Sequence, residues 1–435
     1  MAHALVTVEE HLATILDAVT PVPTRLLPLA EAFGATLAAP ARARVDLPPF
    51  DNSAMDGFAV HHRDVAAASA AAPARLRVVA DLPAGTSDDP AFAAGEAVRI
   101  MTGSPLPSAA DAIVPFEDTV GGLADSLGEI AVTCAPHAVG AHVRRRGEDT
   151  RRGDVVLASG TLLGPLQVGA LAAVGITEVE VARPPRVVIV STGSELVPVE
   201  RLAGDGAGGE VTGSAEAANR DPHDLQLAHG RIPESNGILL AGLVTAAGAR
   251  VVGREIVDDE GSALRDLLTR VTVGPDAADV VVFTGGVSAG AYEVVRQTVA
   301  QMTFRKVAMQ PGKPQGFGVA GRTLLFGLPG NPVSAAVSFE VFVRPALLAL
   351  QGRATSGRPV VRLPAASAWR TPPGRRQYLP VTIDRTDPAA WRAVPASSGG
   401  SHLAGRLGGA EGYAVVPADV DAVAAGDPVD VILID

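Results

Sequence analysis

The segment VVVFTGGVSAG (280–290) carries the clearest fold signal in the 435-residue chain. Four consecutive apolar residues, Val280–Phe283, predict a buried strand, and the glycine-rich turn after them leads into a helix predicted over 292–302. Further strands are predicted at 187–190, 251–257, 304–309 and 323–326, and further helices at 235–248, 263–271 and from Pro332 onwards. Strands that alternate with helices predict a doubly wound, mostly parallel sheet.

Shorter elements of a different pattern flank this α/β region. Residues 1–20 have the apolar spacing of an amphipathic helix, which we expect to pack with the α/β domain. Short apolar runs between glycine, proline and aspartate clusters predict small β-rich units elsewhere. The predicted domains are a discontinuous linker-type mixed α/β domain (21–45 and 146–182), a β-rich domain inserted in it (46–145), the α/β domain (183–351) and a C-terminal β-barrel-like domain (352–435). Residues 202–234 show no periodicity and are predicted to form a surface loop.

Charge and composition narrow the class of protein. The formal net charge of −11 argues against a nucleic-acid-binding protein, because such proteins usually carry a basic face. The single cysteine, Cys134, excludes an intrachain disulfide. No apolar run approaches the roughly 18 residues that a membrane span requires, and the N-terminus lacks the apolar stretch of a signal peptide. We therefore expect a cytoplasmic protein with no membrane or nucleic-acid partner.

A ligand site is expected at the carboxyl ends of the predicted strands, where open α/β sheets bind ligands. Four strands run into polar or glycine-rich loops, at 191–195, 258–260, 284–290 and 327–334. In the last loop, Asn331 can cap the following helix with Pro332 at its first position. Capping explains these two residues, but it does not explain the rigid Leu-Pro-Gly that precedes them.

Glycines and acids in these loops suggest two kinds of ligand. Gly285 and Gly286 would let backbone N–H groups approach an anion, although an ordinary tight turn explains the same residues. Glu195, Asp258 and Glu293 are placed to hold a hard cation such as Mg²⁺ or to act as general bases. Taken singly, each of these acids is also typical of a solvated surface.

Lysine occurs only at Lys306 and Lys313, and arginine is the cation everywhere else. A compact ammonium suits a phosphate or another oxyanion, and prolines on either side of Lys313 fix its backbone. Surface solubility would explain a lysine, but arginine fills that role in the rest of the chain. We therefore predict that both lysines face an anion.

Eight motifs, in order, resemble those of the molybdopterin molybdenumtransferases, the family of the bacterial MoeA proteins and the E domain of gephyrin. They are PPFDNSAMDGFAV (48–60), RIMTGSPLP (99–107), RRRGED (144–149), STGSEL (191–196), ESNG (234–237), FTGGVSAGAYE (283–293), QPGKPQGFG (310–318) and LFGLPGNPVSA (325–335). They cover nearly the whole chain up to about residue 350, and the C-terminal part resembles the family's last domain more loosely. The resemblance implies a homodimer of elongated four-domain subunits, with a MogA-like α/β domain that binds molybdopterin.

The implied activity is insertion of molybdate into adenylylated molybdopterin, with Mg²⁺-dependent release of AMP, to give the molybdenum cofactor. By motif position, the residues that complete the family's cleft against the partner subunit fall on Asp56 and Thr102. Other catalytic positions fall on Glu195, Asp258 and Lys306, and the expected metal ligands are Asp258, Glu293 and Glu195. Expected substrate-binding residues are Asp149, Ser191, Gly193, Gly285, Gly286, Ser288, Lys313, Pro329, Gly330, Asn331, Pro332 and Ser334.

Three features depart from the family pattern. Glu293 stands where aspartate is frequent, which lengthens one carboxylate by a methylene. Gln310 stands where lysine is frequent, so one cation expected near the oxyanions is absent, and Lys306 and Lys313 must carry more of the charge. The 202–234 stretch is longer than the family usually needs.

Other functions remain open at this stage. An adenylyltransferase would make the same adenylylated intermediate, but it needs only the α/β domain, so the additional β domains argue against it. A gephyrin-type scaffold or a pterin-binding carrier is a non-enzymatic alternative, and tungstate is an alternative to molybdate. The expected protein partners are the molybdopterin adenylyltransferase and the apoenzymes that accept the cofactor.

Overall fold

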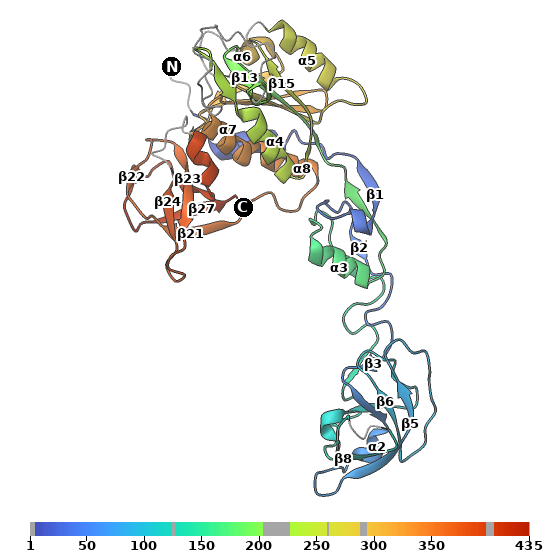
Figure 1. Ribbon diagram of the computed structural model, residues 1–435. Helices are drawn as coiled ribbons and strands as arrows, with labels where there is room; N and C mark the ends of the chain where they lie inside the picture. Colours follow the sequence, from blue (N-terminus) through green and yellow to red (C-terminus); the bar gives the residue numbers. More distant parts are fainter. Residues whose placement is uncertain are drawn as a thin grey trace, which may run out of the picture.

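The computed structural model describes residues 5–123, 127–202, 227–258, 261–287, 294–396 and 404–434. The chain is elongated (Figure 1), as the sequence led us to expect. An α/β unit and a C-terminal β unit lie together at one end, a β-rich unit lies at the other, and two small sheets lie between them. We propose that these units correspond to the predicted domains.

A six-stranded sheet organises the α/β unit, with the strand order β15-β12-β16-β20-β19-β17. Its parallel strands are β12 (Arg186–Thr192), β15 (Arg250–Val257), β16 (Val280–Thr284) and β20 (Thr323–Leu328). Strands β17 (Met302–Lys306) and β19 (Pro314–Ala320) run antiparallel at one edge. The predicted, mostly parallel sheet is confirmed, but the sequence prediction missed β19. Its glycines hide the strand pattern, although they are needed there: a Cβ at Gly318 would lie 2.1 Å from Gln301 O.

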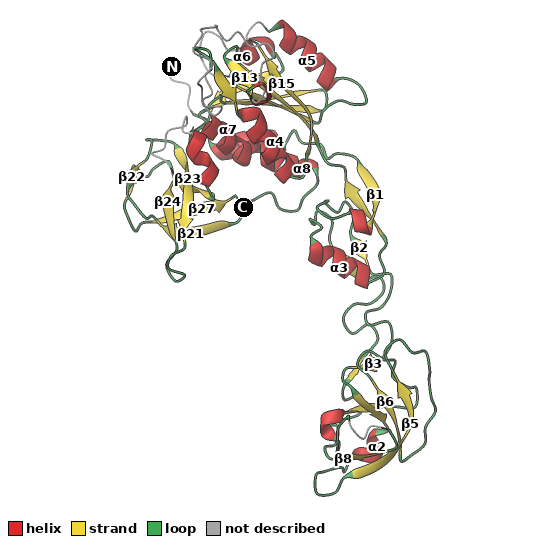
Figure 2. Cartoon of the chain, viewed as in Figure 1, coloured by secondary structure: helices red, strands yellow, loops and turns green. Residues whose placement is uncertain are grey.

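Both faces of the sheet are buried, which explains the continuous apolar runs in its strands. Val187 and Ile189 belong to one hydrophobic core, and Val188 and Val190 belong to the core on the opposite face. Helices cover each face (Figure 2). They are α1 (Val8–Leu16), α4 (Asn236–Ala246), α7 (Pro332–Ser338), the π-helical η5 (Phe339–Val343) and α8 (Arg344–Leu350) on one side, and α5 (Ser262–Thr272) and α6 (Val294–Thr298) on the other.

The continuous helical stretch Pro332–Leu350 contradicts the prediction that no apolar run approaches the length of a membrane span. It has 19 residues and a mean hydropathy of 1.7, so its length and composition alone would allow it to cross a membrane. However, 83% of this stretch is buried inside the protein. It is therefore the core helix of the α/β unit.

Helix α1 docks against this core helix through a buried histidine. A capping box between Thr7 and Glu10 fixes its first turn. The His11 ring meets the Phe342 ring edge-on, with 4.8 Å between centroids. His11 Nδ1 is buried with no hydrogen-bond partner among the described residues. Burial, and secondarily the charge of Arg305, lowers the pKa of His11 to about 4.

We expect this histidine to make stability depend on pH. Because the unfolded chain takes up the His11 proton near pH 6.5 and the folded chain only near pH 4, the free energy of unfolding should fall by about 3 kcal/mol as pH decreases through this window. Urea unfolding followed by circular dichroism at several pH values measures the slope. His11→Phe keeps an aromatic ring against Phe342 and should reduce the dependence of the free energy of unfolding on pH. An unchanged slope in that variant would show that His11 is not the group responsible.

The linker region consists of two small antiparallel sheets and one helix. Strand β1 (Thr24–Pro28) pairs with β11 (Glu178–Ala182), and β2 (Ala41–Arg42) pairs with β10 (Val155–Leu157). Helix α3 (Pro165–Ala173) packs on them and contributes Leu171 to their core. The chain leaves the linker after β2 and returns to it at β10. The β-rich unit is therefore an insertion between these two strands.

The β-rich unit is built on a five-stranded sheet with the order β7-β4-β6-β5-β8. Its elements are β3 (Asn52–Ser53), β4 (Gly57–Val60), α2 (His62–Val65), β5 (Ala74–Leu82), β6 (Glu96–Ile100), β7 (Ala112–Pro115), β8 (Glu129–Val132) and β9 (Val143–Arg144). The pair β3–β9 stands where the chain enters and leaves this unit. The loop between β3 and β4 carries Asp56, and strand β4 is the end of the PPFDNSAMDGFAV motif (48–60).

The C-terminal unit is a second six-stranded sheet, and one of its strands comes from the α/β unit. Strand β18 (Met309–Gln310) pairs in parallel with β23 (Arg376–Asp384). The other strands are β21 (Val360–Pro364), β24 (Arg392–Pro395), β25 (Gly412–Val416) and β27 (Pro428–Leu433), with the separate pair β22 (Trp369–Arg370) and β26 (Ala422–Val423). The QPGKP segment therefore lies where the two units join.

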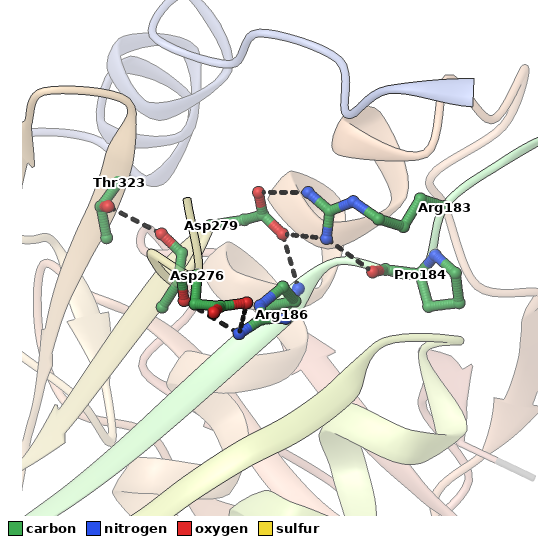
Figure 3. A network of polar contacts seen from close by, with 7 residues as sticks. Arg183, Pro184, Arg186, Asp276, Asp279 and Thr323 are labelled. Atoms are coloured by element: carbon green, nitrogen blue, oxygen red, sulfur yellow. Dashed lines mark hydrogen bonds and ion pairs between the residues drawn. The ribbon is translucent and has the colours of Figure 1, made fainter. Parts of the chain in front are cut away.

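A polar network fixes the point where the linker enters the α/β sheet (Figure 3). The Arg183 guanidinium forms a bidentate pair with the Asp279 carboxylate, at 2.8 and 2.9 Å. The same carboxylate accepts the Arg186 backbone N–H at 2.6 Å, at the first residue of β12. Bidentate arginine–carboxylate pairs restrict orientation as well as distance. This network, which we term the Arg183–Asp279 bracket, sets the direction of the linker.

Candidate functional site

A cavity of about 840 Å³ lies at the carboxyl ends of β12, β16 and β20. This is the edge at which an α/β sheet is expected to bind its ligand. Segment β13 (Leu196–Pro198) and its parallel partner β14 (Ile232–Glu234) lie beside it. The predicted site residues that line the cavity are Ser191, Gly193, Glu195, Gly285, Gly286, Lys313, Pro329, Gly330, Asn331, Pro332 and Ser334.

The Gly285-Gly286 turn approaches the neighbouring strand end closely. Gly285 has φ +88°, and a Cβ there would lie 2.7 Å from Thr192 O. A Cβ built on Gly330 would lie 3.4 Å from Gly285 Cα. Gly285 and the adjacent Gly286 both have positive φ, in the left-handed region that disfavours residues with a side chain. The Gly285 N–H donates to Leu328 O at 3.1 Å, so this donor is engaged within the protein. Gly285 therefore lines the cavity without offering its N–H to a ligand.

Glu234 and Asn236 join three strand ends around the cavity, and neither was among the predicted site residues. The Glu234 carboxylate is 4% exposed and accepts the Ser191 hydroxyl at 2.9 Å and the Gly237 N–H at 2.6 Å. The Asn236 amide donates to Thr284 Oγ1 at 2.8 Å and to Gly330 O at 2.7 Å. The ESNG motif (234–237) was the feature of the sequence that could have identified both residues. The predicted loop over 202–234 concealed it, whereas Ile232–Glu234 is a strand; residues 203–226 lie outside the described residues.

Replacing Asn236 should impair catalysis more than folding. Asn236→Asp keeps the size of the side chain but removes both donors and places a negative charge beside Gly330 O. We expect kcat/KM for an anionic substrate to fall about 100-fold, since Thr284 Oγ1 and Gly330 O lose their donor and the new charge repels the substrate. Thr245→Ala, on the exposed side of the same helix, is the matched control and should retain wild-type kinetics. Equal kinetics of Asn236→Asp and wild type would exclude this role.

Two cations and two acids line the cavity among the described residues. The cations are Lys313 and Arg375, and the acids are Glu195 and Glu234. The turn that presents Lys313 is held by Gln315, whose amide donates at 2.7 Å both to Gly312 O and to Ser338 Oγ. Asn331 stands at the N-cap position with Pro332 at the start of α7, as predicted, and Ser235 likewise precedes α4. Neither residue makes a side-chain capping bond.

Two predicted catalytic residues of the α/β unit do not line the cavity. Asp258 follows the end of β15, and Lys306 ends β17 directly opposite Pro314. Ser288 and Glu293 lie outside the described residues. Within the described part of the chain, no group of three histidine, cysteine or acidic residues could hold a metal ion. Of the two expected Mg²⁺ ligands that the structure describes, Glu195 lines the cavity and Asp258 does not.

Asp56 and Thr102 contact each other in the β-rich unit. Asp56 Oδ1 accepts the Thr102 backbone N–H at 2.6 Å, and both residues are exposed. This backbone hydrogen bond, with a second from the Thr102 side chain, lowers the pKa of Asp56, so the carboxylate is ionised at neutral pH. Asp149 lies exposed where the chain returns towards the linker. All three belong to the arm that Figure 1 shows extending away from the α/β unit.

Comparison with known proteins identifies the family. Residues 6–175 match the model for the MoeA N-terminal region (domain I and II), residues 188–349 a probable molybdopterin binding domain, and residues 362–434 the MoeA C-terminal region (domain IV). The chain belongs to the MoeA family. The resemblance inferred from eight sequence motifs is thereby confirmed.

Relatives of this MoeA family member match it along its length. Molybdopterin molybdenumtransferase 2 of Mycobacterium tuberculosis is 38% identical over 433 residues, covering 98% of each chain. Molybdopterin molybdenumtransferase of Nostoc sp. is 33% identical, covering 88% of this chain and 82% of its own. Among solved structures, the molybdopterin biosynthesis MoeA protein from Pyrococcus horikoshii OT3 has a TM-score of 0.78 at 27% identity and covers 99% of this chain and 100% of its own.

Proposed function

We propose that this chain is a molybdopterin molybdenumtransferase that inserts molybdate into adenylylated molybdopterin and releases AMP, giving the molybdenum cofactor. The observation that carries the proposal is the cavity at the strand ends, which gathers the family's glycine turn, its Leu-Pro-Gly-Asn-Pro loop and Lys313 around one space. Its volume of about 840 Å³ suits a ligand as large as a nucleotide-linked pterin.

The residues of the cavity suggest a division of roles. Lys313 would bind an oxyanion as a point charge, and Ser334, at the N-terminal turn of α7, adds a hydroxyl. Glu195 lines the cavity and lies against Gly193, where a Cβ would be 2.5 Å from its Oε2, so the carboxylate packs closely on the turn. Positioning and charge stabilisation of this kind are the main contributions of a protein to phosphoryl-type cleavage. Mg²⁺ dependence remains part of the proposal, with Glu195 as the described residue that would contact the ion.

We further propose that the working enzyme is a cytoplasmic homodimer. Asp56 and Thr102 lie in the β-rich unit, at the opposite end of the elongated chain from the cavity. If they take part in the reaction, they must reach the cavity of a second copy. Leu26, Phe33, Leu162 and Leu166, all of the linker region, leave apolar side chains 61%, 67%, 45% and 83% exposed, which is a composition typical of subunit interfaces. The molybdopterin adenylyltransferase and cofactor-accepting apoenzymes are the expected partners.

Incubation of the purified protein with adenylylated molybdopterin, molybdate and Mg²⁺ tests the activity. We expect AMP release that requires molybdate, together with cofactor that activates a molybdenum-dependent apoenzyme. Parallel reactions with tungstate measure the preference between the two metal oxyanions. Consumption of ATP with free molybdopterin would instead identify an adenylyltransferase. Absence of AMP release under all conditions would refute the proposal.

A further inference from the structure

The turn that carries Lys313 is fixed at two consecutive carbonyl groups. The Lys313 carbonyl accepts the Val307 N–H at 2.7 Å, and the Gly312 carbonyl accepts the side-chain amide of Gln315 at 2.7 Å. The turn is also closely packed, because Gly312 has φ +94° and a Cβ there would lie 2.8 Å from Ser338 Oγ. The position of the lysine backbone therefore depends in part on the position of Gln315.

Gln315 is a buried residue near the start of β19. It is 1% exposed, and its Nε2 donates to Gly312 O and to Ser338 Oγ, each at 2.7 Å. A carbonyl oxygen can only accept, so the amide nitrogen must face Gly312, and the two acceptors use both of its N–H bonds. Burial of an amide costs free energy unless hydrogen bonds compensate it. This amide is compensated by joining the Lys313 turn to Ser338.

Ser338 connects the turn to a helix that reaches the cavity. Ser338 is the last residue of α7 and is fully buried, whereas Ser334, four residues earlier in the same helix, lines the cavity. Residues four positions apart lie on the same face of a helix. The Gln315–Ser338 hydrogen bond therefore fixes the Lys313 turn relative to the helix that presents the Ser334 hydroxyl. An oxyanion that contacts both the ammonium and the hydroxyl requires a constant distance between them.

We propose that Gln315 is a positioning residue of this site, which holds Lys313 at a fixed place relative to α7. Gln315 does not itself line the cavity, whereas Gly312 and Lys313 do. It acts on a bound anion through the Gly312 carbonyl and the backbone of the lysine. The binding of an oxyanion by Lys313 rests on the proposed function, whereas the hydrogen bonds that hold its turn do not.

A double-mutant cycle between Gln315→Leu and Lys313→Met tests this role, with calorimetric titration of sodium molybdate and of AMP. Lys313→Met should weaken binding of at least one probe by about 10- to 100-fold, because a charge-assisted hydrogen bond is lost. Gln315→Leu should weaken binding of the same probe by about 10-fold, because the released turn lets the ammonium move away from the anion. In the Lys313→Met background, Gln315→Leu should change the affinity by less than about twofold, since it acts through the lysine.

Two further variants separate positioning from a general loss of stability. Gln351 is also a buried glutamine outside the cavity lining, and its amide donates to Ala247 O and Leu347 O at 2.9 Å. Gln351→Leu is therefore the matched control, which should lower the unfolding temperature by about 2 to 4 °C, as Gln315→Leu does, and leave both affinities unchanged. Ser338→Ala added to Gln315→Leu removes the hydroxyl that lost its donor. It should recover part of the unfolding temperature but none of the affinity.

The outcomes of the cycle are distinct from those of the activity assay. Wild-type affinity of Gln315→Leu for both probes would overturn the positioning role, as would an equal loss in Gln351→Leu or an undiminished effect in the Lys313→Met background. A wild-type protein that binds neither probe, or an unchanged affinity in Lys313→Met, would remove the lysine from anion binding and the positioning role with it. Should Gln315→Leu fail to fold by circular dichroism, Gln315→Met, which also lacks donors and is more flexible, takes its place. If the cycle gives the expected result but wild type releases no AMP from adenylylated molybdopterin, the proposed function fails and the positioning role stands.

Discussion

A mixture of two inactive variants, Asp56→Ala and Lys313→Ala, is expected to recover about a quarter of the wild-type activity. Each variant alone should lose activity by about 100-fold or more, because one loses an ionised carboxylate and the other a cation of the cavity. In a mixed dimer, the intact β-rich unit of the Lys313→Ala chain meets the intact cavity of the Asp56→Ala chain. Half of the dimers formed at random are mixed, and each has one intact site of two.

The design separates a cleft formed between subunits from one formed within a chain. Co-expression with two different affinity tags would isolate the mixed dimer, whose AMP release is then measured directly. Asp56→Ala mixed with Thr102→Ala is the matched control, because both defects lie in the β-rich unit and no mixed site is intact. Recovery by the first pair and not by the second supports the cross-subunit cleft. A mixed dimer of Asp56→Ala and Lys313→Ala without activity would place the cleft within one chain or remove Asp56 from it.

Gly285→Ala should reduce kcat/KM strongly, whereas the same change at Gly321 should not. Both glycines have positive φ, +88° and +62°, so alanine costs each of them about 1 kcal/mol or more of backbone strain. At Gly285 the added Cβ would also lie 2.7 Å from Thr192 O, and the turn must move away from the end of β12. At Gly321, in the β19–β20 hairpin, nothing lies within 4 Å of the new Cβ.

This comparison isolates the close approach from the backbone strain. We expect Gly285→Ala to reduce kcat/KM by about 100-fold or more, because the displaced turn narrows the cavity and misaligns the bound substrate. Gly321→Ala should lose a little thermal stability and keep its kinetics. Thermal unfolding and AMP-release assays on both variants measure the two effects. Similar kinetics for the two variants would show that the Gly285 turn is not part of the substrate site.

The sequence predicted best what depends on local pattern. The runs at 187–190 and 280–283 were recognisable as strands because both sheet faces are buried, so every residue is apolar. Strand β19 was missed because glycine replaces the side chains that would mark it, and these glycines make room for β17. Pattern thus located the sheet and the loops at its carboxyl edge, including eleven residues that do line the cavity.

The sequence could not show which distant residues complete the site. Arg375 lies 65 positions after Gln310, and they meet only because β18 joins the sheet of the C-terminal unit. Glu234 ended the predicted surface loop over 202–234, yet its carboxylate is buried and accepts hydrogen bonds from Ser191 and Gly237. Lys306 was grouped with Lys313 by composition, but the antiparallel pairing turns it to a position opposite Pro314, outside the lining. Contacts between residues far apart in the sequence leave no local pattern, and such contacts set the positions of all three side chains, Arg375, Glu234 and Lys306.

The Arg183–Asp279 bracket bears on catalysis although it lies at the opposite edge of the sheet from the cavity. The linker and the β-rich unit together form an arm whose root is this bracket, and Asp56 lies in the loop between β3 and β4 of that arm. A small rotation at the root displaces Asp56 by that angle multiplied by its distance from the root, and displacements of about 1 Å already slow enzymatic reactions. If Asp56 serves a partner's cavity, the accuracy of that encounter depends on the root of the arm, at a salt bridge whose two residues do not line the cavity.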